Sequence, residues 1–278
     1  MEAQKIKTAV VVLNWNGKDW LAKFLPTLVK YSTDATVFVA DNASTDDSLE
    51  FVKYNFPTVK IIINTTNGGY ATGYNDALKQ IDAEYFVLIN SDIEATENWL
   101  SPIINLMDSD KKIAACQPKL LDYNKRNTFE YAGASGGFID NLGYPFCRGR
   151  IFDSLEEDKG QYDDVIEVFW ATGACLFVRA AHYNEVGGLD EDFFAHQEEI
   201  DLCWRLKNKG YKIMNFFTVL GYIGGMMMAI FAFSMHLPAA ILGLILLTIQ
   251  AVDSKMWNLV ILNLISIGGF LTNYIGTL

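Results

Sequence analysis

The chain has 278 residues, of which 51% are hydrophobic and 20% are charged, and its formal net charge is −11. A negative charge of this size argues against a nucleic-acid partner, because a nucleic-acid-binding protein needs a basic face that neutralises phosphates. Of the 22 basic and 33 acidic residues, only Asp253 and Lys255 lie beyond Met214. Residues 1–214 therefore have the composition of a soluble globular domain, and residues 215–278 have that of a membrane segment.

The amino terminus and the cysteines indicate the compartment of the first domain. The segment MEAQKIKTAVVVLNWNG holds a short β-branched run that ends in Asn and Gly, without a small-residue cleavage site, so it is not a signal peptide. The four cysteines form no CxxC pair and show no metal-ligand spacing. We expect free, buried thiols and a first domain that remains in the reducing cytoplasm.

Short apolar runs alternate with helical patterns in the first 115 residues. The runs that predict buried strands are Thr8–Leu13, Thr36–Ala40, Lys60–Ile63 and Tyr85–Ile89. The segments that predict helices are Trp20–Lys30, Ser48–Tyr54 and Gly73–Ile81. This alternation is typical of an α/β domain with a mostly parallel sheet and helices on both faces. Ligands of such sheets bind beyond the carboxyl ends of the strands.

Polar residues follow each of the four predicted strands. These segments are Asn14–Gly17, Asp41–Asp46, Asn64 with Asn67–Tyr70, and Asn90–Asp92. In any one loop, Asn, Asp and Gly are ordinary turn residues. Four successive strands that end in amides and carboxylates at one edge of a sheet instead predict a binding site at that edge.

The pattern is irregular from Lys111 to Ile166, where Gly, Asn and Tyr are frequent, and we expect a substrate-side region with short strands there. Order returns at Val168–Val178, which is a strand-like run. Ala181–Val186 predicts a helix, and a further helix is expected to begin at the acidic segment Glu198–Asp201.

The last 64 residues are expected to lie in a membrane. They contain three apolar runs, at Phe216–Met235, Ala239–Val252 and Met256–Leu278. The first has about 20 residues, enough to cross a bilayer, whereas the middle run is short, so two or three transmembrane helices both remain open. Lys207, Lys209 and Lys212 precede the first run, which places the soluble domain in the cytoplasm by the positive-inside rule. A buried hairpin of a soluble protein is the alternative, and the near absence of charge disfavours it.

Six blocks of sequence carry a resemblance to a known family. They read VVVLNWNG, VADNASTDDS, NGGYATGYNDAL, FVLINSDIEATENWL, ATGACLFVRAAHYNEVGGLDEDFF and HQEEIDLCWRLKNKGYKI, in this order. Together they resemble the family 2 glycosyltransferases with the Rossmann-like GT-A fold, in particular the bacterial rhamnosyltransferase-like enzymes that build cell-surface polysaccharide. The resemblance covers Ile6 to Met214. It implies a glycosyltransferase domain at 1–214, followed by the membrane region at 215–278.

The resemblance implies a site for a nucleotide-sugar donor. Asp41 corresponds to the acid that binds the nucleotide, since its carboxylate can accept hydrogen bonds from the base or the ribose. Asn14 and Asn16 are expected to line the base pocket, and the glycine-rich segment Asn67–Asn75 would bring backbone close to the donor. The donor-binding residues that we predict are Asn14, Asn16, Asp41, Asn67, Gly69, Asn75 and Ser91.

The resemblance to the family also implies a metal site. Asn90-Ser91-Asp92 stands where the family has its Asp-x-Asp motif, with Asn90 in place of the first acid. Asp92 is therefore the predicted ligand of Mg²⁺ or Mn²⁺, hard cations that prefer oxygen. The ion would neutralise the charge that develops on the departing nucleoside diphosphate.

The acidic helix start is predicted to supply the general base. Glu199 aligns with the family's base, and Glu198 is the second choice. For these acids alone, the simpler explanation is that carboxylates favour a helix amino terminus. The residues predicted on the acceptor side are Trp170, Thr172, Gly173 and Asp201, and His196 is either an acceptor contact or a packing residue.

The chain departs from the family after the segment GYKIM. Such enzymes usually continue into another strand and a His-containing segment that helps to hold the metal and the diphosphate, whereas Asn215 begins hydrophobic sequence without such a His. Three explanations are open: another group supplies the ligand, the chain is an inactive relative, or two genes have been joined.

The resemblance and the membrane region together imply an inverting, metal-dependent glycosyltransferase of the hexosyltransferase type. It would move a sugar from a nucleotide-sugar donor to a lipid-linked or growing cell-surface glycan. We expect it at a bacterial-type inner membrane, with the catalytic domain facing the cytoplasm. The alternative is a catalytically inactive, membrane-tethered protein that binds a nucleotide sugar or acts as a scaffold.

Overall fold

The computed structural model describes residues 6–193 and 196–222. The chain divides into two compact units, Met1–Gly224 and Gly225–Leu278. The second unit lies outside the described residues, and so does every part of the expected membrane spans beyond Tyr222. In the described part of the chain, no helix combines the length and the apolar character that a bilayer crossing requires.

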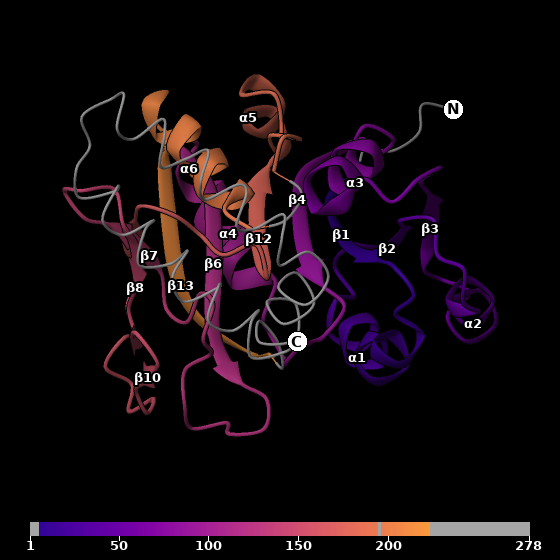
Figure 1. Ribbon diagram of the computed structural model, residues 1–278, viewed down its shortest axis with the longest axis horizontal. Coiled ribbons are helices and arrows are strands. Elements are labelled where there is room, and N and C mark those ends of the chain that lie inside the picture. Colours follow the sequence, from indigo (N-terminus) through magenta and orange to yellow (C-terminus); the bar gives the residue numbers. More distant parts are fainter. Residues whose placement is uncertain (1–5, 194–195, 223–278) are drawn as a thin grey trace, which may run out of the picture. The chain divides into compact units, whose positions relative to one another are not determined.

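The amino-terminal half contains the four predicted parallel strands. They are β1 (Ile6–Asn14), β2 (Thr36–Asp41), β3 (Lys60–Ile63) and β4 (Ala83–Asn90). They lie in the order β4-β1-β2-β3, and every neighbouring pair is parallel (Figure 1). The connecting helices are α1 (Lys18–Tyr31), α2 (Ser48–Asn55) and α3 (Gly69–Leu78). The alternation predicted from the apolar runs is confirmed.

The other half makes the sheet mixed. Its strands are β5 (Ile93–Glu94), β6 (Ile113–Asp122), β11 (Ile166–Val168), β12 (Cys175–Arg179) and β13 (Lys212–Tyr222). Among the described residues, nine strands form one sheet, in the order β11-β13-β6-β12-β4-β1-β2-β3 with β5 on β13. β12 runs antiparallel to both β4 and β6, and β13 is parallel to β6 but antiparallel to β5 and β11. The prediction of a mostly parallel sheet therefore holds only for the first half of the domain.

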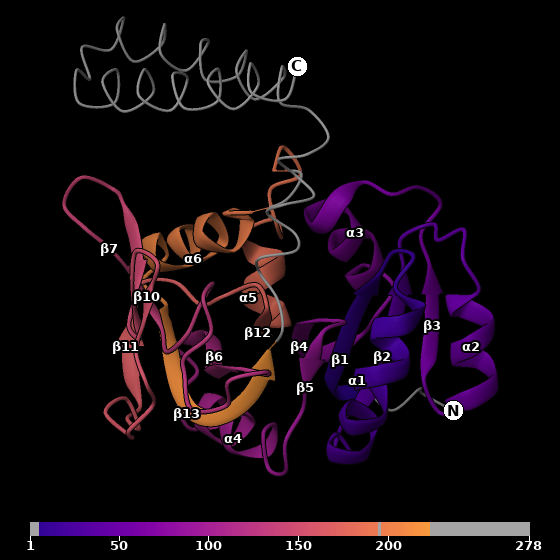
Figure 2. The same ribbon diagram turned by 60° about the horizontal axis from the view of Figure 1, so that its bottom comes forward.

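Helices cover both faces of the sheet, as predicted. One face packs against α1, α2 and α4 (Ser101–Ser109), through side chains such as Leu21, Val52 and Ile103. The opposite face packs against α3, α5 (Ala180–Glu185) and α6 (Glu198–Asn208). Figure 2 shows α3, α5 and α6 on one side of the sheet and α4 on the other. The sheet is thus the central layer of three, with a hydrophobic core on each side.

The strand-like run Val168–Val178 is not one strand. β11 ends at Val168 and β12 begins at Cys175, and the residues between them form a buried loop. The loop is stable without strand pairing because other groups satisfy its backbone: the Trp170 N–H donates to the Gly137 carbonyl at 3.2 Å, and the Thr172 N–H donates to Gln117 Oε1 at 2.9 Å. The prediction of a continuous strand is wrong here, and the loop that replaces it reaches the functional site.

The carboxyl-terminal strand corrects the predicted boundary after Met214. β13 continues to Tyr222, so Phe216–Tyr222, which we expected to open the first membrane span, is part of the sheet. Its backbone pairs with β6 on one side and with β5 on the other, where Gly221 is opposite Glu94. An apolar run explains either structure, because a strand that is buried on both faces is as hydrophobic as a membrane helix.

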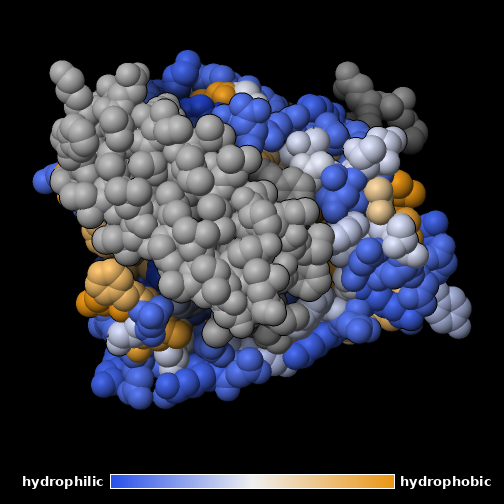
Figure 3. Space-filling view, in the orientation of Figure 1, coloured by the Kyte–Doolittle hydropathy of each residue, from blue (hydrophilic) through white to orange (hydrophobic). Residues whose placement is uncertain are grey.

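The region expected to be irregular begins with a central strand. β6 was not predicted, because its buried Gln117 and Lys119 interrupt the apolar pattern. Beyond β6 lie two small hairpins, β7 (Gly137–Ile139) with β8 (Pro145–Cys147), and β9 (Arg150–Ile151) with β10 (Ser154–Leu155). Figure 3 shows apolar side chains gathered near β7 and β8, where Phe146 is 49% exposed.

Candidate functional site

The polar ends of the predicted strands meet at one edge of the sheet. In the register of the parallel strands, Asn14 at the end of β1 lies opposite Asp41 at the end of β2. Asn90, which ends β4, lies opposite Leu13, one residue earlier on β1. The convergence predicted from the sequence is therefore observed.

Asn14 holds Asp41 in place. The Asn14 Nδ2 group donates to Asp41 Oδ1 at 3.0 Å and to the Ser48 hydroxyl at 2.9 Å. The second oxygen of Asp41 accepts the Ser44 N–H at 2.9 Å. Asn14 and Asp41 are each 1% exposed, so the bonds are shielded from water. The main observed role of Asn14 is to fix the orientation of the Asp41 carboxylate.

Gly17 is required next to this pair. A Cβ atom at position 17 would lie 2.6 Å from Asn14 Oδ1, which is closer than two such atoms approach. That oxygen is buried and has no hydrogen-bond partner among the described residues. A buried acceptor without a partner is costly, so it marks a position at which a donor group of a ligand would be stabilised.

Asn16 supports the rim of the site. Its backbone is in the left-handed region, with φ of 51°, and its side chain is exposed. The Asn16 Oδ1 atom accepts the N–H groups of Thr45 at 2.7 Å and Asp46 at 3.2 Å, so it joins the loop after β1 to the loop after β2. Between the two asparagines, Trp15 is 54% exposed, a residue that the sequence analysis did not assign to the site.

A chain of amides fixes the start of α3. Asn64 Nδ2 donates to Asn42 Oδ1 at 3.1 Å, and Asn42 Nδ2 donates to Asn67 Oδ1 at 2.8 Å. Asn67 Oδ1 also accepts the Gly69 N–H at 3.1 Å. Gly69 has φ of 82°, a conformation that favours glycine. Asn67 and Gly69 therefore shape the predicted donor loop, with Asn42 as a partner that the sequence analysis missed.

Asn75 is engaged by the segment that follows α5. Its Nδ2 group donates to the Leu189 carbonyl at 2.8 Å and to Glu191 Oε1 at 2.9 Å. Its Oδ1 atom accepts the Tyr183 hydroxyl at 2.6 Å and the Leu189 N–H at 3.1 Å. These four bonds use the full capacity of the amide. Asn75 therefore joins α3 to the loop that follows α5, and its contact with the donor stays a prediction.

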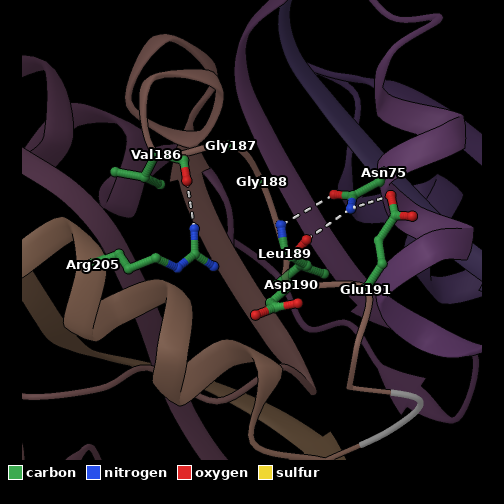
Figure 4. Close-up of a pocket in the computed structure, with 8 residues that line it drawn as sticks. All are labelled: Asn75, Val186, Gly187, Gly188, Leu189, Asp190, Glu191 and Arg205. Atoms are coloured by element: carbon green, nitrogen blue, oxygen red, sulfur yellow. Dashed lines mark hydrogen bonds between the residues drawn. The ribbon is translucent and has the colours of Figure 1, made fainter.

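A pocket of about 390 Å³ lies beside Asn75 (Figure 4). Its lining comes from α3, from the segment Val186–Glu191 and from Arg205 of α6. Figure 4 shows Asn75 and Arg205 on opposite sides, each bonded to the intervening loop. The charged groups of Asp190, Glu191 and Arg205 make this a polar pocket, which suits hydrogen bonding more than apolar contact.

Asp92 lies in the loop between β4 and β5, next to Ser91 and half-buried. Burial raises the pKa of Asp92 to about 6. Burial also raises the pKa of Glu130 to about 7, and the charge of Asp92 contributes to that increase. The Glu130 carboxylate accepts the N–H groups of Ala132 at 2.7 Å and Gly133 at 3.0 Å. Glu130 was not predicted, because nothing in its local sequence distinguishes it from a surface acid.

The acids at this position fit a divalent cation. Two carboxyl groups that are withdrawn from water resist ionisation, and a hard cation with oxygen preference would relieve that cost. Within residues 6–193 and 196–222, however, no three His, Cys, Asp or Glu side chains are grouped so that they could hold an ion. Asp92 therefore fits an ion that takes most of its oxygen ligands from elsewhere, such as from a substrate.

Glu198 and Glu199 begin α6, directly after His196 and Gln197, whose φ angles are 77° and 71°. Burial raises the pKa of both carboxyl groups, and the charge of Glu199 further raises that of Glu198. The Oε2 atom of each is buried and has no hydrogen-bond partner in the described part of the chain. A buried and a half-buried acid, adjacent in the chain and each with a buried, unpartnered oxygen, have the properties of a proton acceptor.

The predicted acceptor-side residues belong to the buried loop between β11 and β12. Trp170 is 4% exposed, and its Nε1–H donates to the Phe138 carbonyl at 2.9 Å. Its ring lies against Gly137 and is covered in this structure, and its contact with the acceptor stays a prediction. Thr172 is 2% exposed, and its hydroxyl accepts the Ala174 N–H at 3.2 Å. Gly173 is also buried, but it is next to Glu199.

Asp201 is engaged within its own helix. Its Oδ2 atom accepts the Arg205 Nε–H at 2.8 Å, and Arg205 Nη2 lies 2.6 Å from the same oxygen in an ion pair. Arg205 in turn donates to the Val186 carbonyl at 2.6 Å. Asp201 therefore contributes to the position of α6 against the preceding loop, and its contact with the acceptor stays a prediction. His196 is exposed.

The order of these residues along the chain matches a known family. The sequence pattern of "Glycosyl transferase family 2" matches residues 9–173. The chain belongs to glycosyl transferase family 2. It is a glycosyltransferase, and its mixed sheet with helices on both faces is a GT-A-like fold.

Relatives of the enzyme include bacterial rhamnosyltransferases. The enzyme is 25% identical over 221 residues to N-acetylglucosaminyl-diphospho-decaprenol L-rhamnosyltransferase of Mycobacterium tuberculosis. The alignment covers 73% of this chain and 71% of the relative. The enzyme is also 22% identical over 213 residues to rhamnosyltransferase WbbL of Escherichia coli, in an alignment that covers 73% of this chain and 78% of WbbL.

Solved structures share the fold at lower identity. GalNAc-T7, crystallised with UDP, GalNAc and Mn²⁺, superimposes with a TM-score of 0.64 at 14% identity, over 80% of this chain and 44% of its own. The mannosyltransferase PcManGT of Pyrobaculum calidifontis, in complex with GDP-Man and Mn²⁺, gives a TM-score of 0.56 at 14% identity, over 91% of this chain and 65% of its own.

Proposed function

We propose that the enzyme transfers a sugar from a nucleotide-sugar donor to a lipid-linked or growing cell-surface glycan, with inversion at the anomeric carbon and with the help of a divalent cation. The observation that supports this proposal most strongly is the pair Glu198 and Glu199. Both acids have raised pKa values, and the Oε2 atom of each has no hydrogen-bond partner among the described residues. They belong to the same domain as Asp41, which ends β2, and Asp92, which follows β4.

The nucleotide is proposed to bind at the ends of β1 and β2. Asp41 is fixed by Asn14 and Ser44, so its orientation does not change when a base or ribose binds. The unpartnered Asn14 Oδ1 atom offers a further acceptor next to it. Trp15 is exposed at this edge, and its indole ring provides a flat apolar surface on which a base would stack. Two structural neighbours were crystallised with UDP or with a GDP-sugar.

The cation is proposed to bind between Asp92 and the diphosphate of the donor. Mg²⁺ or Mn²⁺ at this position would neutralise the charge that develops on the leaving nucleoside diphosphate. Asp92 supplies one carboxylate, and Glu130 adds a nearby negative charge that favours the ion. Both structural neighbours named above were crystallised with Mn²⁺.

Glu199 is proposed to act as the general base. As the acceptor hydroxyl oxygen attacks the anomeric carbon, its proton passes to the Glu199 carboxylate and the bond from that carbon to the diphosphate breaks. Attack opposite the leaving group inverts the configuration. Burial at the start of α6 raises the pKa of Glu199, which makes its carboxylate a stronger base than an exposed glutamate.

The acceptor is proposed to be attached to a lipid. The relative from Mycobacterium tuberculosis is named for an acceptor on decaprenyl diphosphate. Residues 215–278 contain only two charged side chains, which supports attachment to an inner membrane with the catalytic unit in the cytoplasm. We also propose that the part of the chain beyond Tyr222 forms two or three membrane helices.

A screen for turnover tests the function. The full chain is purified in detergent and is incubated with nucleotide sugars, with Mn²⁺ or Mg²⁺, and with a polyprenyl-diphosphate sugar. We expect one donor to be consumed, and Glu199→Gln to lower kcat by about 10²–10⁴-fold while Glu198→Gln retains more activity. Binding of nucleoside diphosphate without turnover of any donor would instead support the inactive scaffold.

A calorimetric comparison tests the donor site. Asp92→Asn should remove the part of nucleoside diphosphate binding that depends on Mn²⁺, because a neutral amide is a poorer ligand for the cation. Asp41→Ala should weaken binding with and without Mn²⁺. Equal affinities of wild type and Asp92→Asn at saturating Mn²⁺ would contradict the metal assignment.

A further inference from the structure

Tyr70 connects the donor side of the site to its acidic helix. It is the second residue of α3 and is half-buried. Its hydroxyl donates to the Gly173 carbonyl at 2.6 Å, a bond between residues 103 positions apart in the chain. The bond therefore joins the glycine-rich donor segment to the loop between β11 and β12.

The position of Tyr70 is fixed by its neighbours. Its ring packs edge-to-face against Tyr74, with 4.6 Å between the ring centroids. Tyr74 is fully buried, and its hydroxyl donates to the carbonyls of Ile89 at 3.1 Å and Val11 at 3.3 Å, on two central strands. The Tyr70 hydroxyl is thus held at a constant distance from the strand ends that form the site.

Gly173 lies between Tyr70 and the acidic pair. A Cβ atom at position 173 would be 3.1 Å from the Tyr70 hydroxyl and 3.7 Å from the Glu199 Cβ atom. The loop backbone is therefore in close contact with both residues. Burial, and the charges of Glu198 and Glu199, raise the pKa of Tyr70 well above its usual value. The hydroxyl consequently remains protonated and remains a donor to the Gly173 carbonyl.

From these contacts we infer that Tyr70 is a positioning residue for the acceptor-side base, which it serves by holding the Gly173 backbone against which Glu199 packs. Because Tyr70 lies in the first turn of α3, it also links the placement of the base to the loop that we propose binds the donor. This inference rests on the proposed function, since it assigns the base role to Glu199.

Loss of the Tyr70 hydroxyl is expected to lower the catalytic rate and to leave donor binding unchanged. Removal of the hydroxyl releases the Gly173 carbonyl, and the loop and Glu199 can then shift relative to the acceptor. Small displacements of a catalytic group cost on the order of 10- to 100-fold in rate. Donor binding should be unaffected, because Asp41 and Asp92 have no contact with the Tyr70 hydroxyl in the described structure.

The test compares two Tyr→Phe variants in the full-length protein. Tyr70→Phe is expected to lower kcat by at least about 10-fold, with the donor KM and the calorimetric Kd for nucleoside diphosphate within about 2-fold of wild type. The control is Tyr85→Phe near the start of β4, a buried tyrosine whose hydroxyl donates to Asp108 Oδ1 at 2.7 Å, away from Tyr70 and Glu199. It should lower Tm by as much as Tyr70→Phe or more, with kcat within about 2-fold of wild type.

The outcomes separate this inference from the proposed function. A wild type without turnover overturns both. An active wild type that requires Glu199, with Tyr70→Phe as active as Tyr85→Phe, overturns only the role of Tyr70. If Tyr70→Phe does not fold, Gly173→Ala tests the same contact from the loop side, since its methyl group would lie between Tyr70 and Glu199. It should also lower kcat and leave donor Kd unchanged, and an unchanged kcat would contradict the inference.

Discussion

Buried carboxyl groups distinguish the functional edge of the sheet. Burial is the largest cause of the raised pKa values of Asp92, Glu130, Glu198 and Glu199. Each of these groups holds its proton at a higher pH than an exposed acid does. A general base must be ionised before the reaction, so the same burial that strengthens the base also sets the pH above which it works.

The pH dependence of activity follows from this relation. We expect the acidic limb of kcat/KM to lie above the ordinary range of glutamate, with activity lost as the pH falls through the raised pKa of Glu199. Burial, and the charge of Glu199, raise the pKa of Glu198 to about 8, so Glu198 is still protonated when Glu199 ionises. Glu198→Gln should therefore leave the acidic limb where it is in wild type. The measurement is the pH profile of kcat/KM for both proteins. A limb that moves to lower pH would contradict this order of ionisation.

Glu130 should make the fold less stable at alkaline pH. Burial raises the pKa of Glu130 from its ordinary value of 4.5 to about 7, so between these values the folded state binds more protons than the unfolded state. Its contribution to stability is fully present below pH 4.5 and is lost as the pH rises through 7, by an amount on the order of 3 kcal/mol.

Glu130→Gln, compared with wild type in the absence of added cation, should therefore gain in relative Tm between pH 5 and pH 8. The matched control is Glu157→Gln at an exposed position, whose Tm difference from wild type should stay the same across this range. A Tm difference for Glu130→Gln that is constant between the two pH values would contradict the buried charge.

At the scale of elements, the apolar periodicity predicted most of the first half of the domain. β1, β2 and β4 were found because each is a short run of apolar residues buried on both faces of the sheet, and β3 was found from its three isoleucines, of which Ile62 is buried. β6 was missed because two buried polar residues, Gln117 and Lys119, lie within it. Lys119 is compensated by ion pairs with Asp158 and Asp163, which are distant in sequence and leave no local signal.

The residues of the candidate site likewise divide into those whose position local sequence predicts and those whose contacts depend on distant segments. Asp41 and Asp92 follow strands, so their shared position at one sheet edge could be predicted. The observed contacts of Trp170 and Asn75 could not be predicted, because their partners Phe138 and Leu189 lie in other segments of the chain. Local sequence identifies which residues end a strand, but it does not identify which of them are already engaged by a distant partner.

Trp170 is expected to support the fold. Trp170→Phe loses the hydrogen bond from Nε1 to the Phe138 carbonyl and leaves that partly buried carbonyl without this donor. We expect the free energy of unfolding to fall by about 1–3 kcal/mol, as measured in urea, with the acceptor KM unchanged. Trp204→Phe is the control, because Trp204 is 46% exposed, and it should have little effect. A raised acceptor KM at unchanged stability would support the original prediction of a sugar contact at Trp170.

At the scale of the whole molecule, the sheet extends past the compositional boundary. The change in charge density after Met214 led to a predicted boundary there, yet β13 continues to Tyr222. Its last eight residues pair with β6 from Gln117 to Asp122 and with β5. Low charge density therefore does not by itself separate a membrane segment from a central strand.

Truncation tests the position of the boundary. A protein that ends after Tyr222 retains the whole of β13 and should unfold in one cooperative thermal transition. A protein that ends after Met214 leaves one edge of β6 unpaired from Gln117 onward, and we expect it to lose the cooperative transition or to aggregate. Circular dichroism during heating distinguishes the two. Equal transitions would show that residues 215–222 are not needed by the sheet.

The place where β13 ends also has a mechanical consequence. Tyr222 lies in register with Ile93, the residue after Asp92, and with Asp122 of β6. β5 is held to β13 by only two residue pairs, whereas the register between β6 and β13 runs from Lys212 to Tyr222. A pulling force applied to the chain beyond Tyr222 would load both pairings together, and β5 would be released completely after two residue pairs while the rest of the register still held β6. The first segment to lose its support would be the one that contains Asp92, so tension along the chain would reach the donor side of the site first.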